Sequence, residues 1–361
     1  MSTGRYSRLD RALHDVAFAG SWMQLALADV EDSVFSRSLA EVSIQKPVFI
    51  TSLPRAGTTL LLELMASVPA FASHSYRLMP FVLCPLLWDH LSKPFRRETS
   101  LHERAHGDGI KIGFDSPEAF EEVVWLAFWK RKYSAGHIEV WQSTDRDDEF
   151  ERFLRQHMRK IVRIRRDAVG GSPLLRYCSK NNANVARLSL LPELFPDCRI
   201  VIPFRNPRDH VGSLVRQHRR FTEIHAQDRF AFRYMRWLGH FEFGELLRPI
   251  DFDGWTADVA AEFGAADYWL SYWVAAYEAV LRTAGACVCF FDYDDACERP
   301  APALEALGRW LELEPVTDLT AQAPRFGAPP RYTELVLDDH GLEARADRVF
   351  DSLRARSLKA V

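Results

Sequence analysis

The segment from Pro47 to Ala66 most constrains what this chain can fold into. It begins with the apolar run Val-Phe-Ile-Thr-Ser-Leu, passes through the turn Pro-Arg-Ala-Gly-Thr-Thr and ends in Leu-Leu-Leu-Glu-Leu-Met-Ala. A β-branched run bounded by two prolines is typical of a buried strand, whereas the later run is typical of a helix. The sequence therefore predicts a strand, a tight turn and a helix in direct succession.

The same alternation returns later in the chain. Strands are expected over 173–178, 198–204 and 286–291, and helices over 183–194, from Pro207 onward, over 267–283 and over 301–312. Successive strand and helix units build parallel sheets with helices on both faces. We expect an α/β fold with a mainly parallel, P-loop NTPase-like sheet.

Length and composition fit one domain over 1–361. The chain has 361 residues, of which 47% are hydrophobic, enough for a large core. Helical spacing of apolar residues predicts N-terminal helices within 1–45. Residues 88–171 are irregular, charge-rich and broken by glycines, with helical stretches at 117–130 and 147–166, and we interpret them as an inserted, largely helical lid or acceptor-binding region.

The charge balance gives no reason to expect a nucleic-acid partner, because 46 Lys and Arg face 49 Asp and Glu. The six cysteines form no C-x-x-C pair, so neither a disulfide framework nor a zinc cluster is indicated, and a cytoplasmic location is expected. No apolar run reaches about 18 residues, so no membrane span is predicted.

The turn after the first strand resembles a broken Walker A loop. In the window 52–59, Ser52 replaces the first glycine and Thr58 replaces the lysine. The backbone at Ala56 and Gly57 and the hydroxyls of Thr58 and Thr59 still suit an anion at a helix N-terminus. Arg55 offers the missing positive charge, and its guanidinium suits a phosphate or a sulfonate. The alternative is an ordinary turn.

A second anion motif follows the strand at 198–204. Arg205 leaves the end of that strand, and Ser213 lies eight residues later on the next helix. Both side chains are placed to reach one phosphate beyond the strand ends.

Together these two motifs resemble the superfamily of cytosolic and Golgi sulfotransferases, which use phosphoadenosine phosphosulfate (PAPS). The resemblance rests on 53–59 and 201–213, with support from Lys180 and from the run Tyr293-Asp-Asp. It implies that the first loop, from Arg55 to Thr59, binds the 5′-phosphosulfate and that Arg205 and Ser213 bind the 3′-phosphate. It implies PAPS as co-substrate, phosphoadenosine phosphate (PAP) as product and a small-molecule, glycan or lipid hydroxyl as acceptor.

The resemblance also implies catalytic roles. Sulfuryl transfer by in-line displacement needs positive charge at the leaving phosphate oxygen and a base for the acceptor hydroxyl, and requires no metal. Lys180 and Arg55 are expected at the leaving group. His74 is the expected base, because the tyrosylprotein branch carries its glutamate in this stretch and no carboxylate stands here. The rival bases are Glu118, Glu121 and Glu122, which would otherwise serve a helix N-terminus begun by Ser116 and Pro117.

Two departures from the superfamily and three alternatives stay open. No Trp follows Thr59, so the adenine-stacking residue is unassigned, and the late glycine-rich loop is missing, which leaves Arg325 or Arg331 as its replacement. The alternatives are a P-loop kinase or NTPase, a non-catalytic nucleotide-binding module and a zinc hydrolase using His102-Glu103-x-x-His106. The acceptor's identity and the oligomeric state are not determined by the sequence.

Overall fold

Five parallel strands form the central sheet of the protein, in the order β2–β6–β1–β7–β9. The computed structural model describes residues 8–18, 20–93, 102–103, 111–112, 116–134, 136–170, 175–259, 262–328, 331–332 and 335–359. The strands are β1 (Val48–Ile50), β2 (Phe71–Ala72), β6 (Arg176–Lys180), β7 (Arg199–Phe204) and β9 (Val288–Asp292). The predicted α/β fold with a mainly parallel sheet is confirmed.

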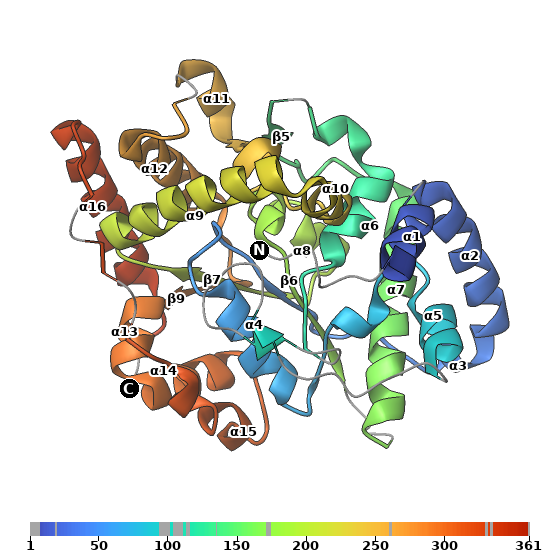
Figure 1. The fold of residues 1–361 in the computed structure, drawn as a ribbon. Coiled ribbons are helices and arrows are strands. Elements are labelled where there is room, and N and C mark those ends of the chain that lie inside the picture. Colours follow the sequence, from blue (N-terminus) through green and yellow to red (C-terminus); the bar gives the residue numbers. More distant parts are fainter. Residues whose placement is uncertain are drawn as a thin grey trace.

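Helices cover both faces of this sheet (Figure 1). One face packs against α4 (Thr58–Ser67), α13 (Tyr293–Glu298), α14 (Pro300–Trp310) and α15 (Thr317–Thr320). The other face packs against α7 (Asp148–Ala168), α9 (Pro207–Gln227), α12 (Ala266–Thr283) and α16 (His340–Arg356). The last of these helices was not anticipated from the sequence.

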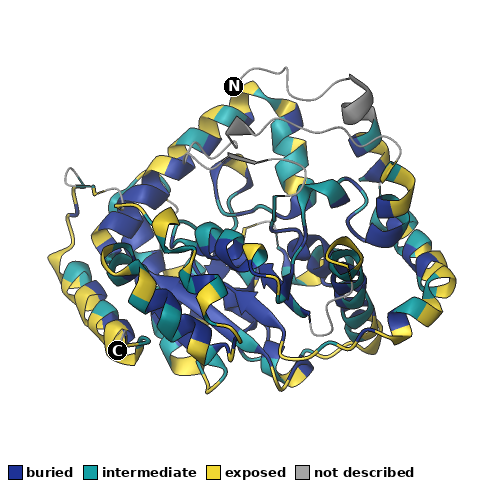
Figure 2. Ribbon diagram, turned by 90° about the horizontal axis from the view of Figure 1, so that it is seen from below, coloured by how far each residue is buried: buried dark blue, intermediate teal, exposed yellow. Residues whose placement is uncertain are grey.

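Alternation of side chains along the strands divides the core into these two halves. Val48 and Ile50 of β1 belong to the cluster under α4, whereas Phe49 between them belongs to the opposite cluster. All three side chains are fully buried. A strand buried on both faces reads as a continuous apolar run, which is why the sequence identified it. Figure 2 shows the strands as a buried layer between helices whose outer sides are exposed.

The N-terminal helices are α1 (Arg8–Ala17), α2 (Ser21–Val34) and α3 (Ser36–Ala40), and they lie beside α5 (Pro85–Ser92) and α7 (Figure 1). Lys160 of α7 is 1% exposed and pairs with Glu31 and Asp32 of α2, each at 2.7 Å. This buried ion pair joins the N-terminal helices to the main fold. No helix of the described residues has the length and apolarity needed to cross a bilayer.

The segment 88–171 contains β3 (His102–Glu103), β4 (Lys111–Ile112), α6 (Glu121–Phe128), β5 (Ile138–Glu139) and α7. Residues 94–101, 104–110 and 113–115 lie outside the described part, and the interpretation as an inserted lid stays a prediction. The expected start of a helix at Ser116 and Pro117 is wrong. These residues instead run antiparallel to Ser75, because Tyr76 N donates to Ser116 O at 3.1 Å.

The helix predicted over 183–194 is also wrong. The structure has a 3-10 helix, η4 (Asn182–Arg187), followed by the separate helix α8 (Leu191–Leu194). Pro192 has no N–H to donate to an earlier carbonyl, so it starts a new helix instead of continuing the old one. The remaining helices that bear on the site are α10 (Arg229–Leu238) and α11 (Trp255–Asp258), and a short strand, β8 (Ile250–Asp251), pairs with β5.

Candidate functional site

The turn between β1 and α4 has a strained backbone. Arg55 has a φ of 73° and Gly57 a φ of 96°. A non-glycine residue in the left-handed region persists only where its surroundings fix it, and such residues cluster at functional sites. Gly57 caps α4, and a Cβ added there would lie 2.3 Å from the Tyr293 ring. Only glycine fits this position, where the first amides of α4 are available to an anion.

His210 fixes this turn from α9. Its Nε2 lies 2.8 Å from Pro54 O, and the Trp273 indole N–H donates to its Nδ1 at 3.1 Å. Because Nδ1 accepts, the proton of the neutral ring sits on Nε2 and is donated to Pro54. Burial, with the positive charge of Arg205, lowers the pKa of His210 to about 3. The ring is therefore a neutral structural support for the turn.

The two sequence motifs meet at this turn. Arg55 Nε donates to Ser213 Oγ at 3.2 Å, and Arg205 Nη1 donates to the carbonyl of Arg55 at 3.3 Å. The reason is topological, since β1 and β7 are adjacent parallel strands whose carboxyl ends reach the same edge of the sheet. Residues about 150 positions apart thus form one cationic site.

Arg205 is held by Tyr293 and Asp294, to which the sequence analysis assigned no contact with it. Its side chain is 5% exposed, its Nε lies 3.8 Å from Asp294 Oδ1 and its guanidinium lies 5.7 Å from the Tyr293 ring centroid. Asp294 also accepts a hydrogen bond from Asn206 N at 2.6 Å. The run Tyr293-Asp-Asp supported the resemblance, but only the pairing of β9 with β7 shows that it orients Arg205.

Lys180 and Asn182 bring the end of β6 to the same edge. Lys180 is the last residue of β6, pairs with Ile50 of β1 in register and is 8% exposed. Asn182 accepts a hydrogen bond from Thr58 Oγ1 at its Oδ1 (3.3 Å) and one from Thr51 Oγ1 at its backbone carbonyl (3.2 Å). Asn182, which the sequence analysis did not single out, therefore ties β6 to the turn.

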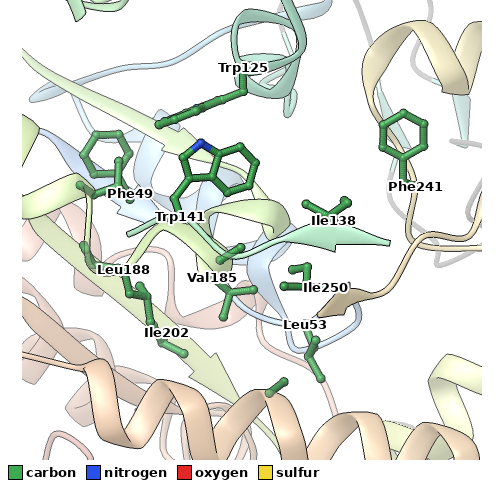
Figure 3. Packing of buried hydrophobic residues seen from close by; sticks show 14 of the residues in the cluster. Phe49, Leu53, Trp125, Ile138, Trp141, Val185, Leu188, Ile202, Phe241 and Ile250 are labelled. Carbon is green, nitrogen blue, oxygen red and sulfur yellow. The ribbon is translucent and has the colours of Figure 1, made fainter. Parts of the chain in front are cut away.

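A cavity opens beside this edge of the sheet. It is lined by residues 52–54, 180–183, 239–242 and 247–250, by Ala119, Glu122 and Ile138, and by Trp269 and Tyr272 of α12. Most of these side chains are apolar or aromatic. Figure 3 shows four residues that line this cavity and also belong to the core, namely Leu53, Ile138, Phe241 and Ile250. The first turn and Lys180 thus border a pocket that suits a small molecule.

His74 does not reach this cavity. Its side chain is 1% exposed, and its Nε2 lies 2.8 Å from Nε2 of His157 on α7. Burial lowers the pKa of His74 to about 3 and that of His157 well below its ordinary value. An enclosed ring paired with another ring is not placed to take a proton from a bound acceptor, so the expectation of a base at His74 needs correction.

Glu122 lines the cavity, but its carboxylate is engaged elsewhere. It forms two hydrogen bonds with Arg187, at 2.7 and 3.0 Å, and both residues are almost fully buried. The guanidinium of Arg187 lies 4.1 Å from the Trp125 ring centroid and 4.3 Å from that of Trp141. Figure 3 shows these two rings side by side. Glu122 therefore belongs to a buried structural ion pair.

The other two rival carboxylates are also engaged. Glu121 is fully buried and accepts hydrogen bonds from Tyr177 (2.9 Å) and Asn184 (2.7 Å). Glu118 accepts from the hydroxyl of Tyr76. Neither lines the cavity, and Glu121 lies in the first turn of α6, where the sequence analysis allowed a helix N-terminal role.

The two arginines proposed to replace the late loop lie in different places. Arg325 pairs with Glu63 of α4. Arg331 pairs with Asp209 of α9 at 3.0 Å, one helical turn before Ser213. Of the two, Arg331 is therefore the one near the second motif.

The residues of the zinc hydrolase alternative that the structure describes do not lie on a helix. His102 and Glu103 lie in strand β3, which pairs antiparallel with β4, and His106 lies outside the described residues. The H-E-x-x-H arrangement needs both histidines on one helical face. Within the described residues no three His, Cys, Asp or Glu side chains form a metal-binding group.

Comparison with known proteins gives one family match, since a model of the sulfotransferase family matches residues 47–242, more than half of the chain. No curated protein sequence matches significantly. Among solved structures, sulfotransferase STF9 from Mycobacterium avium is 14% identical (91% of this chain and 82% of that one, TM-score 0.47). Sulfotransferase STF1 from Mycobacterium tuberculosis H37Rv is 18% identical, and the match covers 91% of this chain and 81% of that one with a TM-score of 0.42. The sulfotransferase domain of the Synechococcus PCC 7002 olefin synthase is 14% identical, and the match covers 87% of this chain and 98% of that one with a TM-score of 0.37.

Proposed function

The chain belongs to the sulfotransferase family, and from this premise we propose that it transfers a sulfuryl group from PAPS to an acceptor hydroxyl. The observation that carries the proposal is the contact between the two anion motifs. Arg55 reaches Ser213, and Arg205 reaches the backbone of Arg55. A nucleotide with phosphate groups at both ends of its ribose needs two anion sites a few ångströms apart, and this edge of the sheet offers them.

The proposal divides the donor between the two motifs. Arg55, the backbone of 56–57 and the hydroxyls of Thr58 and Thr59 bind the 5′-phosphosulfate at the start of α4. Arg205 and Ser213 bind the 3′-phosphate. The positive φ of Arg55 supports this assignment, because strain at a turn is typical of a backbone shaped for a ligand.

Lys180 and Arg55 supply positive charge where the leaving phosphate oxygen gains negative charge. In the proposed step the acceptor oxygen forms a bond to sulfur while the bond from sulfur to the phosphate oxygen breaks, and its electron pair stays on PAP. Stabilising that charge in a partly enclosed site lowers the barrier without a metal ion. The place of Lys180, at the end of β6 and on the cavity wall, supports this role.

The acceptor occupies the cavity beside Lys180 in this proposal. The wall contributed by 247–250, Trp269 and Tyr272 is largely apolar or aromatic. Such a wall favours a hydroxyl carried by an apolar or aromatic body over a bare sugar, because burying sugar hydroxyls against it leaves them without hydrogen bonds.

Calorimetry with PAP and with ATP plus magnesium tests the donor site. Wild type is expected to bind PAP and to bind ATP much more weakly. Arg205→Ala is expected to weaken PAP binding about 100-fold, because a buried guanidinium contributes about 2–3 kcal/mol to a phosphate contact. Arg208→Ala is the matched control, since Arg208 belongs to the same motif but pairs with Glu343 of α16.

Equal losses in Arg205→Ala and Arg208→Ala would indicate a general charge effect and contradict the assigned 3′-phosphate site. A preference for ATP would instead support the kinase or NTPase alternative. Binding of PAP without consumption of PAPS on any hydroxyl acceptor would support a non-catalytic module. Thermal melting of each variant separates loss of binding from loss of fold.

A further inference from the structure

We propose that His240 is the base that takes the proton from the acceptor hydroxyl, and that Glu242 positions it. The proposal rests on the proposed sulfuryl transfer and adds to it the group that His74 cannot supply. His240 and Glu242 both line the cavity that Lys180 and Asn182 also border.

The chain after α10 places these side chains. Gly239 ends α10 in the left-handed conformation, with φ 77°, and His240 N donates to Met235 O at 3.0 Å. Beyond it the side chains alternate: Phe241 and Phe243 are 4% and 6% exposed, whereas the side chains of His240 and Glu242 are 15% and 25% exposed. The aromatic residues anchor the segment in the core and leave the polar pair at the cavity.

Glu242 lies between His240 and the turn from β1 to α4, which is proposed to bind the donor and is called the donor turn below. Its Oε2 is 3.6 Å from His240 Nδ1, and its Oε1 accepts a hydrogen bond from Asn182 Nδ2 at 3.0 Å. The same amide group accepts from Thr58 Oγ1 through its Oδ1. A chain of contacts therefore leads from the first residue of α4, through Asn182 and Glu242, to His240.

The charge on Glu242 determines the orientation of the imidazole. Burial acts to raise the pKa of Glu242, but contact with His240, the charge of Lys180 and the amide of Asn182 together lower it to about 2. An ionised carboxylate beside Nδ1 favours the proton on Nδ1 and leaves the lone pair of Nε2 available. Histidine held in this way by a carboxylate is the usual arrangement of a general base.

The other ionisable groups around the cavity are less suited to this role. Glu122 is committed to its buried ion pair, and Lys180 is a cation. Burial raises the pKa of Tyr272, whose hydroxyl also accepts from Ile250 N at 3.1 Å. Arg248, a second cation on the wall, lies with its guanidinium 4.5 Å from the Phe241 ring centroid and cannot accept a proton.

The step balances without any further reactant. The O–H bond of the acceptor breaks and its proton passes to His240 Nε2, while the acceptor oxygen bonds to sulfur and PAP leaves with the electron pair of the broken S–O bond. No atom is oxidised or reduced. The imidazolium then returns its proton to water through the mouth of the cavity.

Nuclear magnetic resonance of labelled histidines in the PAP complex tests the pair without an acceptor. The His240 signals, assigned by their loss in His240→Gln, are expected to show the Nδ1–H form. The Nδ1–H form is expected to give way to a mixture of the two neutral forms in Glu242→Gln and to persist in Glu242→Asp. An Nε2–H form in wild type, or a tautomer that Glu242→Gln leaves unchanged, overturns the proposal.

Transfer from PAPS to a panel of phenols and alkyl alcohols tests the catalytic role. His240→Gln is expected to lower kcat about 100-fold or more and to remove the acid limb of the pH profile of kcat/KM, with little change in KM. The loss should be much smaller for 4-nitrophenol, an acidic phenol that is already partly ionised near neutral pH and needs little help from a base. His340→Gln, a change at an exposed residue of α16, is the control for loss of a histidine.

The outcomes separate this inference from the function on which it rests. If wild type neither binds PAP nor consumes PAPS, the proposed function fails. If wild type binds and transfers, and His240→Gln keeps its rate and pH profile, only the assignment of His240 fails. Glu242→Gln examines the same pair if His240→Gln does not fold, and an unchanged pH profile in that variant also overturns the assignment.

Discussion

At the scale of single residues, the core of this protein encloses imidazoles that stay neutral. His74 and His157 form a pair between the sheet edge and α7, and His210 supports the turn between β1 and α4. Burial is the first cause of the lowered pKa of each ring. Such rings pack as aromatic side chains and use their nitrogens for fixed hydrogen bonds, so a histidine in a sequence does not by itself indicate catalysis.

Stability is expected to fall as the pH drops below about 6.5. The folded-state pKa of His74 and of His210 is about 3, below the ordinary value of 6.5. Between these values the unfolded chain binds protons that the folded chain excludes. Each such ring therefore costs about 1.4 kcal/mol of unfolding free energy per pH unit, and the stability is fully present above pH 6.5. Urea unfolding at pH 7.5, 6 and 5 measures the slope of the unfolding free energy against pH.

His74→Gln is expected to make this slope shallower by about one proton, because glutamine keeps a polar group near His157 but does not titrate. His340→Gln changes a histidine that is 89% exposed and should leave the slope unchanged. Equal slopes in wild type and His74→Gln would show that the buried ring does not govern acid stability.

At the scale of elements, the start of α4 depends on one glycine. The turn needs a positive φ at Gly57, and the ring of Tyr293 from α13 leaves no room for a Cβ. The same ring lies beside Arg205, so one aromatic side chain borders both anion motifs. Local sequence indicates a turn here, whereas the ring comes from a segment more than 230 residues later.

Gly57→Ala is expected to weaken PAP binding at least about 10-fold and to destabilise the fold by about 1–3 kcal/mol, because it adds backbone strain and a steric clash. Calorimetry with PAP and thermal melting measure the two effects. Gly264→Ala is the matched control, because a Cβ there meets no atom within 4 Å. Combining Gly57→Ala with Tyr293→Leu should recover part of the stability, and no recovery would mean that the ring is not the obstacle.

At the scale of the whole molecule, the ion pair of Glu122 and Arg187 joins α6 to η4, the 3-10 helix that follows β6. Arg187 is fully buried and lies close to both Trp125 and Trp141. A buried pair is weak evidence of net stabilisation, but removing one partner leaves a charge without compensation. The pair is therefore one of the contacts that attach the segment 116–170 to the sheet region, beside the hydrogen bond from Tyr177 of β6 to Glu121.

Glu122→Gln is expected to lower the unfolding free energy by about 3–5 kcal/mol. Chemical denaturation checks this, with Glu149→Gln at an exposed position of α7 as control. If Glu122→Gln lost activity while its unfolding free energy stayed unchanged, Glu122 would be catalytic and its structural role would be contradicted. The effect on PAP affinity should be small, since Glu122 lies on the cavity wall and not in the donor turn.

The parts of the site that the sequence predicted are those with local signals. Gly57 and Arg55 follow a strand directly, and Arg205 and Ser213 have a fixed spacing along one strand and helix, so the chain itself identifies them. His240 and Glu242 carry no such signal. They follow the end of α10 and become neighbours of Asn182 only because α9 and α10 return the chain to the end of β6.

The sequence by itself determined the alternating strands and helices, the turn after the first strand and the spacing of Arg205 and Ser213, because backbone propensity and apolar periodicity act between near neighbours. Tertiary structure alone decided that the two motifs share one edge of the sheet, that His74 faces His157 and that a cavity opens in front of His240. The physical reason is that the protonation and accessibility of a side chain depend on what surrounds it in space. The order of residues along the chain does not give those surroundings.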